Sequence, residues 1–446
     1  MIEDSSMSKK QIGALLLVGI FLQPAQADTL PEVIKRTLNN NPDVLITTNT
    51  RLAVDQALRQ ARANYLPSIE LNGGYGREKS DNPTTQAQTG GDRSLNRSEL
   101  SLTVSQTLFD GFSTRYAVEN QSAQVESAAH RVADVSEIIA LRTTEVYIDV
   151  FRRKELLELA KDNLVTHQKT LDQVREVVES GARGKADLQQ TESRLALANS
   201  NLINAQGNLR DAEASYKRVT DELPKNLEKV NTDAVRQAIP RSIEALIDLA
   251  LQNHPSILSA QADLAAAEAA YQQSGANYMP HVYVELGASK NENLDGVEGD
   301  NDDLSAMLKM RYNLYKGGAD SAKRAETAKR IDVAKETLRR NQRIVEENAK
   351  LAWNSMITIR ERLQYIQQHV DATSLVLSSY REQFKLGQRS LLDVLDSENE
   401  LFSARSTLTA GQYTELLSLF NVLESSGMLL QTLSIPRPTE AAIQKD

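Results

Sequence analysis

The residue types that most often carry catalysis occur in this chain, but they do not form a recognised site. Five histidines are scattered over the sequence, without an HExxH motif or a two-histidine ligand pair: His130, His167, His254, His281 and His369. "GARGKA" at 181–186 has a Gly-Lys pair but lacks the spacing and the Ser/Thr of a P-loop, and no G-x-S-x-G occurs. There are no cysteines to supply thiolate ligands or disulfides. We therefore expect a protein that is not an enzyme and holds no cofactor or metal.

Charged side chains gather at two other kinds of place. The segment 291–303 carries six carboxylates, but their spacing does not match an EF-hand, so we interpret it as a solvated outer loop and leave cation binding open. "GARGKADLQQTE" (181–192) and "GQRSLLDVLDSE" (387–398) each place a carboxylate, Asp187 or Asp393, six residues after a glycine. A carboxylate in that position can cap the N-terminus of a following helix.

The two glycine segments belong to an internal duplication. They align at an offset of 206 residues, as do "TLFDGF" (107–112) and "NLYKGG" (313–318). "QARANYLPSIEL" (60–71) and "QSGANYMPHVYV" (273–284) align at 213 residues and share Asn-Tyr-x-Pro. The chain is therefore a two-copy repeat, which we place at 28–222 and 242–433. A linker at 223–241 joins the copies, and 434–446 forms a C-terminal tail.

The apolar periodicity predicts the same elements in both copies. Period-two alternation predicts strands at 67–77, 98–109, 280–290 and 303–315, with polar hairpin ends between the strands of each pair. Helical spacing predicts helices at 31–64, where Pro42 allows a helix to restart, and at 242–278. Heptad seams predict long paired helices at 112–178, 186–222, 319–385 and 390–433, and the segments 112–178 and 319–385 contain neither glycine nor proline. Each copy should thus hold one β-hairpin and one antiparallel helical hairpin.

The N-terminus and the overall charge bear on location. Lys9, Lys10, an apolar run and Ala25-Gln26-Ala27 predict a secretory signal peptide at 1–27. Met7 is an alternative start, because the acidic residues before it fit a signal peptide poorly. A net charge of −9 argues against nucleic acid as a partner. Strands of about ten residues can cross a bilayer when tilted, but four cannot close a barrel. We expect the chain to oligomerise in an outer membrane, with a soluble sheet capping a coiled coil as the alternative.

These features together closely resemble the TolC family of outer-membrane efflux and secretion ducts. The resemblance covers about 29–433 and rests on the duplication, the paired Asn-Tyr-x-Pro motifs and the Gly-x-x-x-x-x-Asp tips. It implies a mainly α-helical homotrimer, in which a membrane β-barrel of twelve strands continues into a periplasmic α-barrel of twelve helices. It also implies outer-membrane lipid, a periplasmic adaptor and an inner-membrane ABC transporter or proton-driven pump as partners.

The resemblance also assigns roles to residues at the hairpin tips. It makes Asp393 and Asp396 candidates for acidic rings at a gated entrance, where they would favour cations, and it has Arg389 latch toward Asp187. Phe384 stands where the family often has tyrosine, and Ala186 where a hydroxyl residue is common, so the gate could be arranged differently. The implied adaptor-docking residues are Gly181, Arg183, Gly387 and Leu391. The implied junctions between strands and helices are Pro67, Gly111, Pro280 and Gly317.

The cargo is less well determined than the duct. Overall resemblance to agglutination and adhesin-export members slightly favours type I protein secretion over multidrug efflux. A non-channel periplasmic coiled-coil or adaptor protein is the competing class, but the duplicated hairpins with amphipathic strands argue against it. The inner-membrane partner selects the cargo, so this sequence leaves the substrate open.

Overall fold

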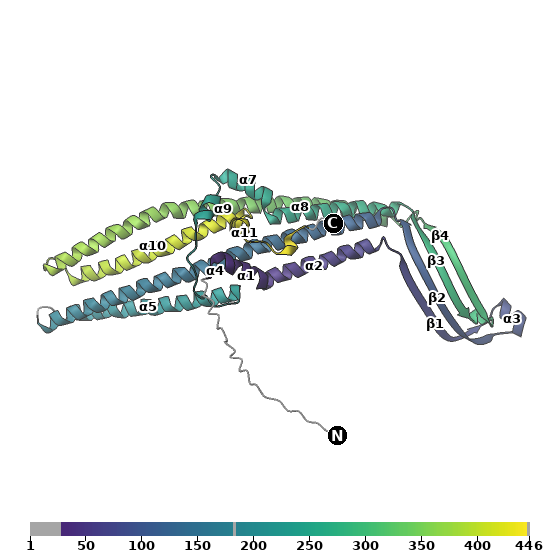
Figure 1. Ribbon diagram of the computed structural model, residues 1–446, viewed down its shortest axis with the longest axis horizontal. Helices are drawn as coiled ribbons and strands as arrows, with labels where there is room; N and C mark the ends of the chain where they lie inside the picture. The colour runs from purple at the N-terminus through teal and green to yellow at the C-terminus, as the bar shows by residue number, and fades with distance from the viewer. Residues whose placement is uncertain (1–27, 182–183, 444–446) are drawn as a thin grey trace, which may run out of the picture.

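A computed structural model describes residues 28–181 and 184–443, which form an elongated molecule with a sheet at one end (Figure 1). The predicted signal peptide and Arg183 lie outside these residues. Four long helices dominate the described part: α4 (Ser113–Glu179), α5 (Lys185–Thr220), α9 (Ala319–Lys385) and α10 (Leu391–Ser425). Helix α4 pairs with α5, and α9 pairs with α10, as two antiparallel hairpins. None of the helices described is both long and apolar enough to cross a membrane.

Each of the two predicted shorter helices is broken by a proline. The segment predicted as one helix at 31–64 forms α1 (Leu30–Asn40) and α2 (Pro42–Ala63), and 242–278 forms α7 (Ile243–Asn253), α8 (Pro255–Ser274) and the 3₁₀ turn η1 (Gly275–Tyr278). The residue before each proline, Asn41 or His254, is extended, with ψ of 128° or 124°. The restart expected at Pro42 is confirmed, whereas the prediction of an unbroken helix at 242–278 was wrong, because a proline disfavours the helical conformation of the residue before it.

The four strands form one antiparallel sheet in the order β1-β2-β3-β4. They span β1 (Ser68–Ser80), β2 (Arg93–Phe109), β3 (His281–Glu292) and β4 (Asp300–Arg311). The predicted strand at 303–315 ends early, because Arg311 pairs with His281 and the preceding Pro280 has no N–H to extend the ladder. The first β-hairpin, conversely, is longer than predicted, since pairing continues to Ser80 and Arg93.

The ends of the two β-hairpins are ordered structures that contact each other. Between β1 and β2 lies the helix α3 (Pro83–Thr89), and between β3 and β4 lies the turn η2 (Leu294–Gly296). Asn82 caps α3 and donates from Nδ2 to the Asp295 carbonyl at 2.8 Å. Thr85 is fully buried, against Gly296. These polar segments were predicted to be solvent-exposed loops, and that is wrong for Thr85, because the two repeats pack against each other here.

The sheet carries rows of apolar side chains on one face. The register aligns Leu71 with Leu102, Ala288 and Leu304 across the four strands. Their neighbours two residues along align in the same way, from Ile69 to Ala306. Leu304 is 88% exposed and Ile69 70%, so no other part of residues 28–181 and 184–443 covers this face at the edges of the sheet. An uncovered apolar face between two open edges indicates contact with another surface, lipid or protein.

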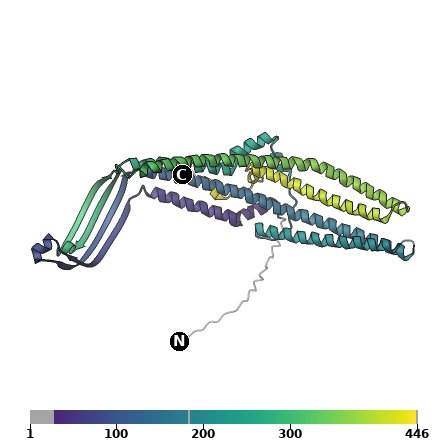
Figure 2. The same cartoon turned by 180° about the vertical axis from the view of Figure 1, so that it is seen from behind.

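The main core lies at the middle of the molecule, where helices of both repeats meet (Figures 1 and 2). Tyr147 on α4 is fully buried, and its hydroxyl lies 2.8 Å from the Asp28 carbonyl oxygen and 2.5 Å from that of Glu228. The linker contains a short helix, α6 (Asp233–Ala238), whose Arg236 donates from Nη1 and Nη2 to the two carboxylate oxygens of Glu415 at 3.0 and 2.9 Å. The start of the first repeat and the linker are therefore anchored on the long helices.

The C-terminal segment turns back along α4. The helix predicted at 390–433 ends at Ser425, because Gly427 has a φ of +72° and reverses the chain before α11 (Leu429–Thr432) and the 3₁₀ turn η3 (Thr439–Ala441). Arg437 then pairs with the buried Glu137 of α4 at 2.7 Å. Glu137 also accepts a hydrogen bond from the Leu430 backbone N–H at 3.1 Å.

The structure places the four predicted junction residues between a strand and a helix. Pro67 and Pro280 each precede the first strand of a hairpin, and Gly111 and Gly317 follow the second. Both glycines have positive φ, +69° and +61°. A Cβ added at Gly111 would lie 2.7 Å from the Ala276 carbonyl oxygen, whereas one at Gly317 would meet no described heavy atom within 4 Å.

Gly111→Ala should therefore destabilise the protein more than Gly317→Ala. Both variants place an alanine in a left-handed conformation, at about 1–2 kcal/mol, and only Gly111→Ala adds overpacking of about 1–3 kcal/mol. The midpoint of heat unfolding in detergent measures the difference. Equal shifts for the two variants would contradict the close approach at Gly111.

Near the C-terminal turn, burial and neighbouring carboxylates raise the pKa of Glu424. Burial, together with the nearby charges of Glu137, Asp134 and Glu145, raises the pKa of Glu424 to about 7. Because the pKa of Glu424 is raised in the folded state, its contribution to the free energy of unfolding is largest below pH 4.5, the ordinary pKa of the group. This contribution is lost as the pH rises toward 7, where the buried carboxyl loses its proton.

Glu424→Gln should therefore raise the free energy of unfolding at about pH 8, by up to about 3 kcal/mol, and change it little at about pH 4.5. Thermal unfolding at the two pH values tests this. Glu400→Gln, an exposed change on the same helix, is the matched control and should have a small effect at both. A gain of equal size at both pH values would show that the charge of Glu424 is not the cause.

Candidate functional site at the hairpin tips

The second hairpin tip is a tight turn closed by a capping box. Gly387 has a φ of +73°, and α10 starts four residues later. The Ser390 hydroxyl accepts from the Asp393 N–H at 3.2 Å and donates to the Asp393 carboxylate at 2.8 Å. Asp393 therefore caps the helix, which is the alternative that the sequence offered for it.

Arg389 contacts its own tip. Its guanidinium lies 4.0 Å from the centre of the Tyr380 ring, Nε donates to the Gln383 side chain at 3.1 Å, and Nη1 lies 3.8 Å from the Asp393 carboxylate. The structure therefore brings Arg389 together with Asp393. The latch from Arg389 toward Asp187 stays a prediction.

Apolar packing joins the two tips within one chain. Leu391 and Leu395 of α10 pack with Val174 of α4, and Phe384 and Val178 lie against them. Leu391, predicted as an adaptor-docking residue, is 2% exposed, so its side chain lies between the hairpins and is not presented at the surface. Phe384 takes part in this apolar cluster, so a ring without a hydroxyl suits its position.

The first tip has a similar turn. Gly181 has a φ of +77°, and Gly184 precedes α5. Asp187 lies in the first turn of α5, where a carboxylate is favoured by the helix dipole. Arg194, two turns further along α5, pairs with Asp396 of α10. Asp396, predicted as part of an acidic ring, is thus an inter-hairpin contact in this chain.

A second inter-hairpin contact lies deeper, and the sequence analysis missed it. His167 of α4 and Glu398 of α10 are both buried, and His167 Nδ1 lies 3.7 Å from Glu398 Oε2. Arg381 of α9 donates to the other carboxylate oxygen at 2.9 Å. Burial lowers the pKa of His167 against the opposing effect of Glu398. No local sequence pattern indicated this contact, because it joins residues of two different hairpins.

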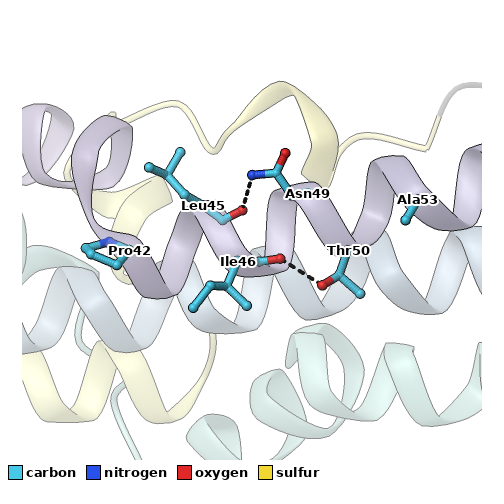
Figure 3. A pocket seen from close by; sticks show the side chains of 6 residues that line it. All are labelled: Pro42, Leu45, Ile46, Asn49, Thr50 and Ala53. Carbon is cyan, nitrogen blue, oxygen red and sulfur yellow. Dashed lines mark hydrogen bonds between the residues drawn. The ribbon is translucent and has the colours of Figure 1, made fainter.

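Helix α2 presents an apolar strip that no described element covers (Figure 3). Ile46 is 63% exposed and Leu45 41%. Asn49 and Thr50 turn their polar groups back to carbonyls of their own helix, at 2.8 Å each. The strip therefore offers little but apolar surface. In the described residues no group of three or more His, Asp or Glu side chains is arranged to hold a metal.

Two comparisons with known proteins agree on the kind of protein, and a third agrees on the fold. A family model described as outer membrane efflux protein matches residues 33–220 and 246–426. The outer membrane efflux protein BepC of Brucella suis is 24% identical, over 93% of this chain and 89% of its own. The alkaline protease secretion protein AprF of Pseudomonas aeruginosa is also 24% identical, and the match covers 94% of this chain and 88% of AprF. The solved structure of CusC has a TM-score of 0.77 at 18% identity and covers 89% of this chain and 91% of that one.

Arg389→Ala and Asp396→Ala should each raise single-channel conductance in a planar bilayer. Arg389→Ala removes the guanidinium that Tyr380 and Asp393 hold at the tip, and Asp396→Ala removes the contact with Arg194 on the other hairpin, so each variant should loosen the tip. Asp371→Asn, an exposed change on α9 above the tip, is the control and should leave conductance unchanged. Unchanged conductance in both tip variants would rule out these residues as parts of a gate.

Proposed function

Since this chain belongs to the outer membrane efflux protein family, we propose that three copies of it form one export duct for type I protein secretion. The protein is an outer-membrane channel of a tripartite efflux or secretion system, reaches into the periplasm and is not an enzyme. In the proposed assembly three four-stranded sheets close one barrel of twelve strands, and twelve helices continue it as a tunnel. A periplasmic adaptor and an inner-membrane transporter complete the system.

The observation that carries the assembly is the four-stranded sheet with its two open edges. Within the part of the chain that the structure describes, strands β1 and β4 are each hydrogen-bonded on one side only, and an unpaired edge is not tolerated in lipid. Pairing β4 of one copy with β1 of the next would satisfy both edges and would carry the apolar rows around a closed surface. The uncovered strip on α2, from Pro42 to Ala53, supports the same neighbour contact lower down. The number of copies comes from the family.

The cargo assignment has a weaker basis than the assembly. AprF is named for the secretion of a protease, and its similarity over nearly the whole chain supports protein secretion. BepC is named as an efflux protein and is equally similar, which supports drug efflux as the second candidate. A periplasmic coiled-coil protein without a channel is disfavoured, because such a protein does not need an uncovered apolar sheet face.

Complementation in cells that lack their own channel tests the proposal. The chain is expressed with a type I transporter, its adaptor and a protein substrate, and separately with a proton-driven drug pump and its adaptor. We expect secreted protein in the medium and little gain in drug tolerance. Leu304→Asp, which places a charge on the exposed apolar row of β4, should abolish secretion by preventing membrane insertion.

Two outcomes would count against different parts of the proposal. Drug tolerance restored without secretion would overturn the cargo and favour efflux. A wild-type chain that does not form a detergent-extractable membrane trimer would overturn the duct itself.

A further inference from the structure

The buried contact between the two hairpins contains charge that packing alone does not require. His167 lies twelve residues before the end of α4, about 18 Å above the tip. It meets Glu398, which lies eight positions into α10, and both side chains are at most 4% exposed. Buried carboxylates are costly unless paired. Glu398 is paired on one side only, with Arg381.

Two polar atoms in this contact are incompletely satisfied. His167 Nδ1 and Glu398 Oε2 face each other at 3.7 Å, and neither has a hydrogen-bond partner among the described residues. Water would satisfy both atoms if the hairpins moved apart. The contact between His167 and Glu398 is therefore stable while water is excluded, and both side chains gain hydrogen bonds when water enters. This is the behaviour of a contact that can open.

The surrounding charges come from all four long helices. Glu398 faces His167 from α10, Arg381 approaches from α9, and Arg194 acts on His167 from α5, where it pairs with Asp396. Arg381 and Arg194 are partly exposed, so they can follow their carboxylates into water. His167 and Glu398 cannot be hydrated without separation of α4 from α10.

We propose that His167, Glu398 and Arg381 form a lock between the two helical hairpins of each copy, and that acid releases it. The proposal rests on the proposed function as a gated duct, whose entrance these hairpins would surround. Separation of the hairpins at the lock would widen that entrance. The lock is a buried contact that responds to protons, and it acts in addition to the contacts of Arg389 and Asp396 at the tip.

The direction of the response follows from burial. Burial is the largest influence on His167 and lowers its pKa, Arg194 acts in the same direction, and Glu398 opposes them. A hydrated imidazole binds a proton at about pH 6.5. Opening therefore raises the proton affinity of His167, so the closed contact has its full strength above that pH and weakens as the pH falls.

Distances between the tips test the lock without the need for a functioning channel. The chain has no cysteine, so Glu179→Cys and Lys385→Cys, both exposed and one on each hairpin, can carry spin labels. In detergent-solubilised protein we expect the distance distribution to shift to longer values between about pH 7.5 and pH 5. His167→Gln, which stays neutral, should abolish the shift. Glu398→Ala should give the longer distances already at about pH 7.5.

His369→Gln is the matched control, because His369 is an exposed histidine on α9 at a similar distance from the tip. In this variant the distance between the two spin labels should lengthen on acidification as it does in the wild type. An acid-induced shift that survives in His167→Gln would overturn the proposal, and so would an unchanged distance in the wild type. Single-channel recordings add the functional readout, in which wild-type conductance should rise several-fold on acidification and His167→Gln should not respond. A wild type that shifts but conducts no current would contradict the proposed duct and leave the lock standing.

Discussion

Helices of 67 residues are stable only if they pack along their length, because their apolar seam is narrow and their other faces are polar. Helices α4 and α9 each find a partner within their own repeat, through α5 and α10. The middle of α4 also contacts α2, α8 and α10, so it joins the first repeat to the second. The C-terminal segment packs against this helix, and the linker is held by α4 at Tyr147 and by α10 at Glu415.

Because of the duplication, both repeats are built from the same kinds of element, and they differ where the two copies meet. Both prolines that break the shorter helices are followed by similar helices, α2 and α8. At the tips, however, the second hairpin has the full capping box of Ser390 and Asp393, while the first has Gly184 in place of a capping side chain. Asymmetry of this kind is expected if the second hairpin moves against the first.

The architecture could be predicted because its signals are long and repeated. Heptad spacing, period-two strands and the paired Asn-Tyr-x-Pro motifs located all the major elements, and the structure has a positive φ at Gly111, between a strand and a helix. The breaks at Asn41 and His254 depend on local proline geometry, which periodicity does not report. The contact of His167 with Glu398 joins residues 231 positions apart and requires the packing of two hairpins, so no local pattern could indicate it.

The hydroxyl of Tyr147 links two segments that are far apart along the chain. It touches the carbonyls of Asp28 and Glu228, and Asp28 also pairs with Leu227 in a single parallel bridge. The segment at Asp28 therefore meets Tyr147 across 119 residues of sequence and Leu227 across about 200, whereas the turn of the first helical hairpin closes locally. Contacts between distant residues form slowly. Assembly of each copy should thus proceed from the hairpins inward, with the midsection closing last.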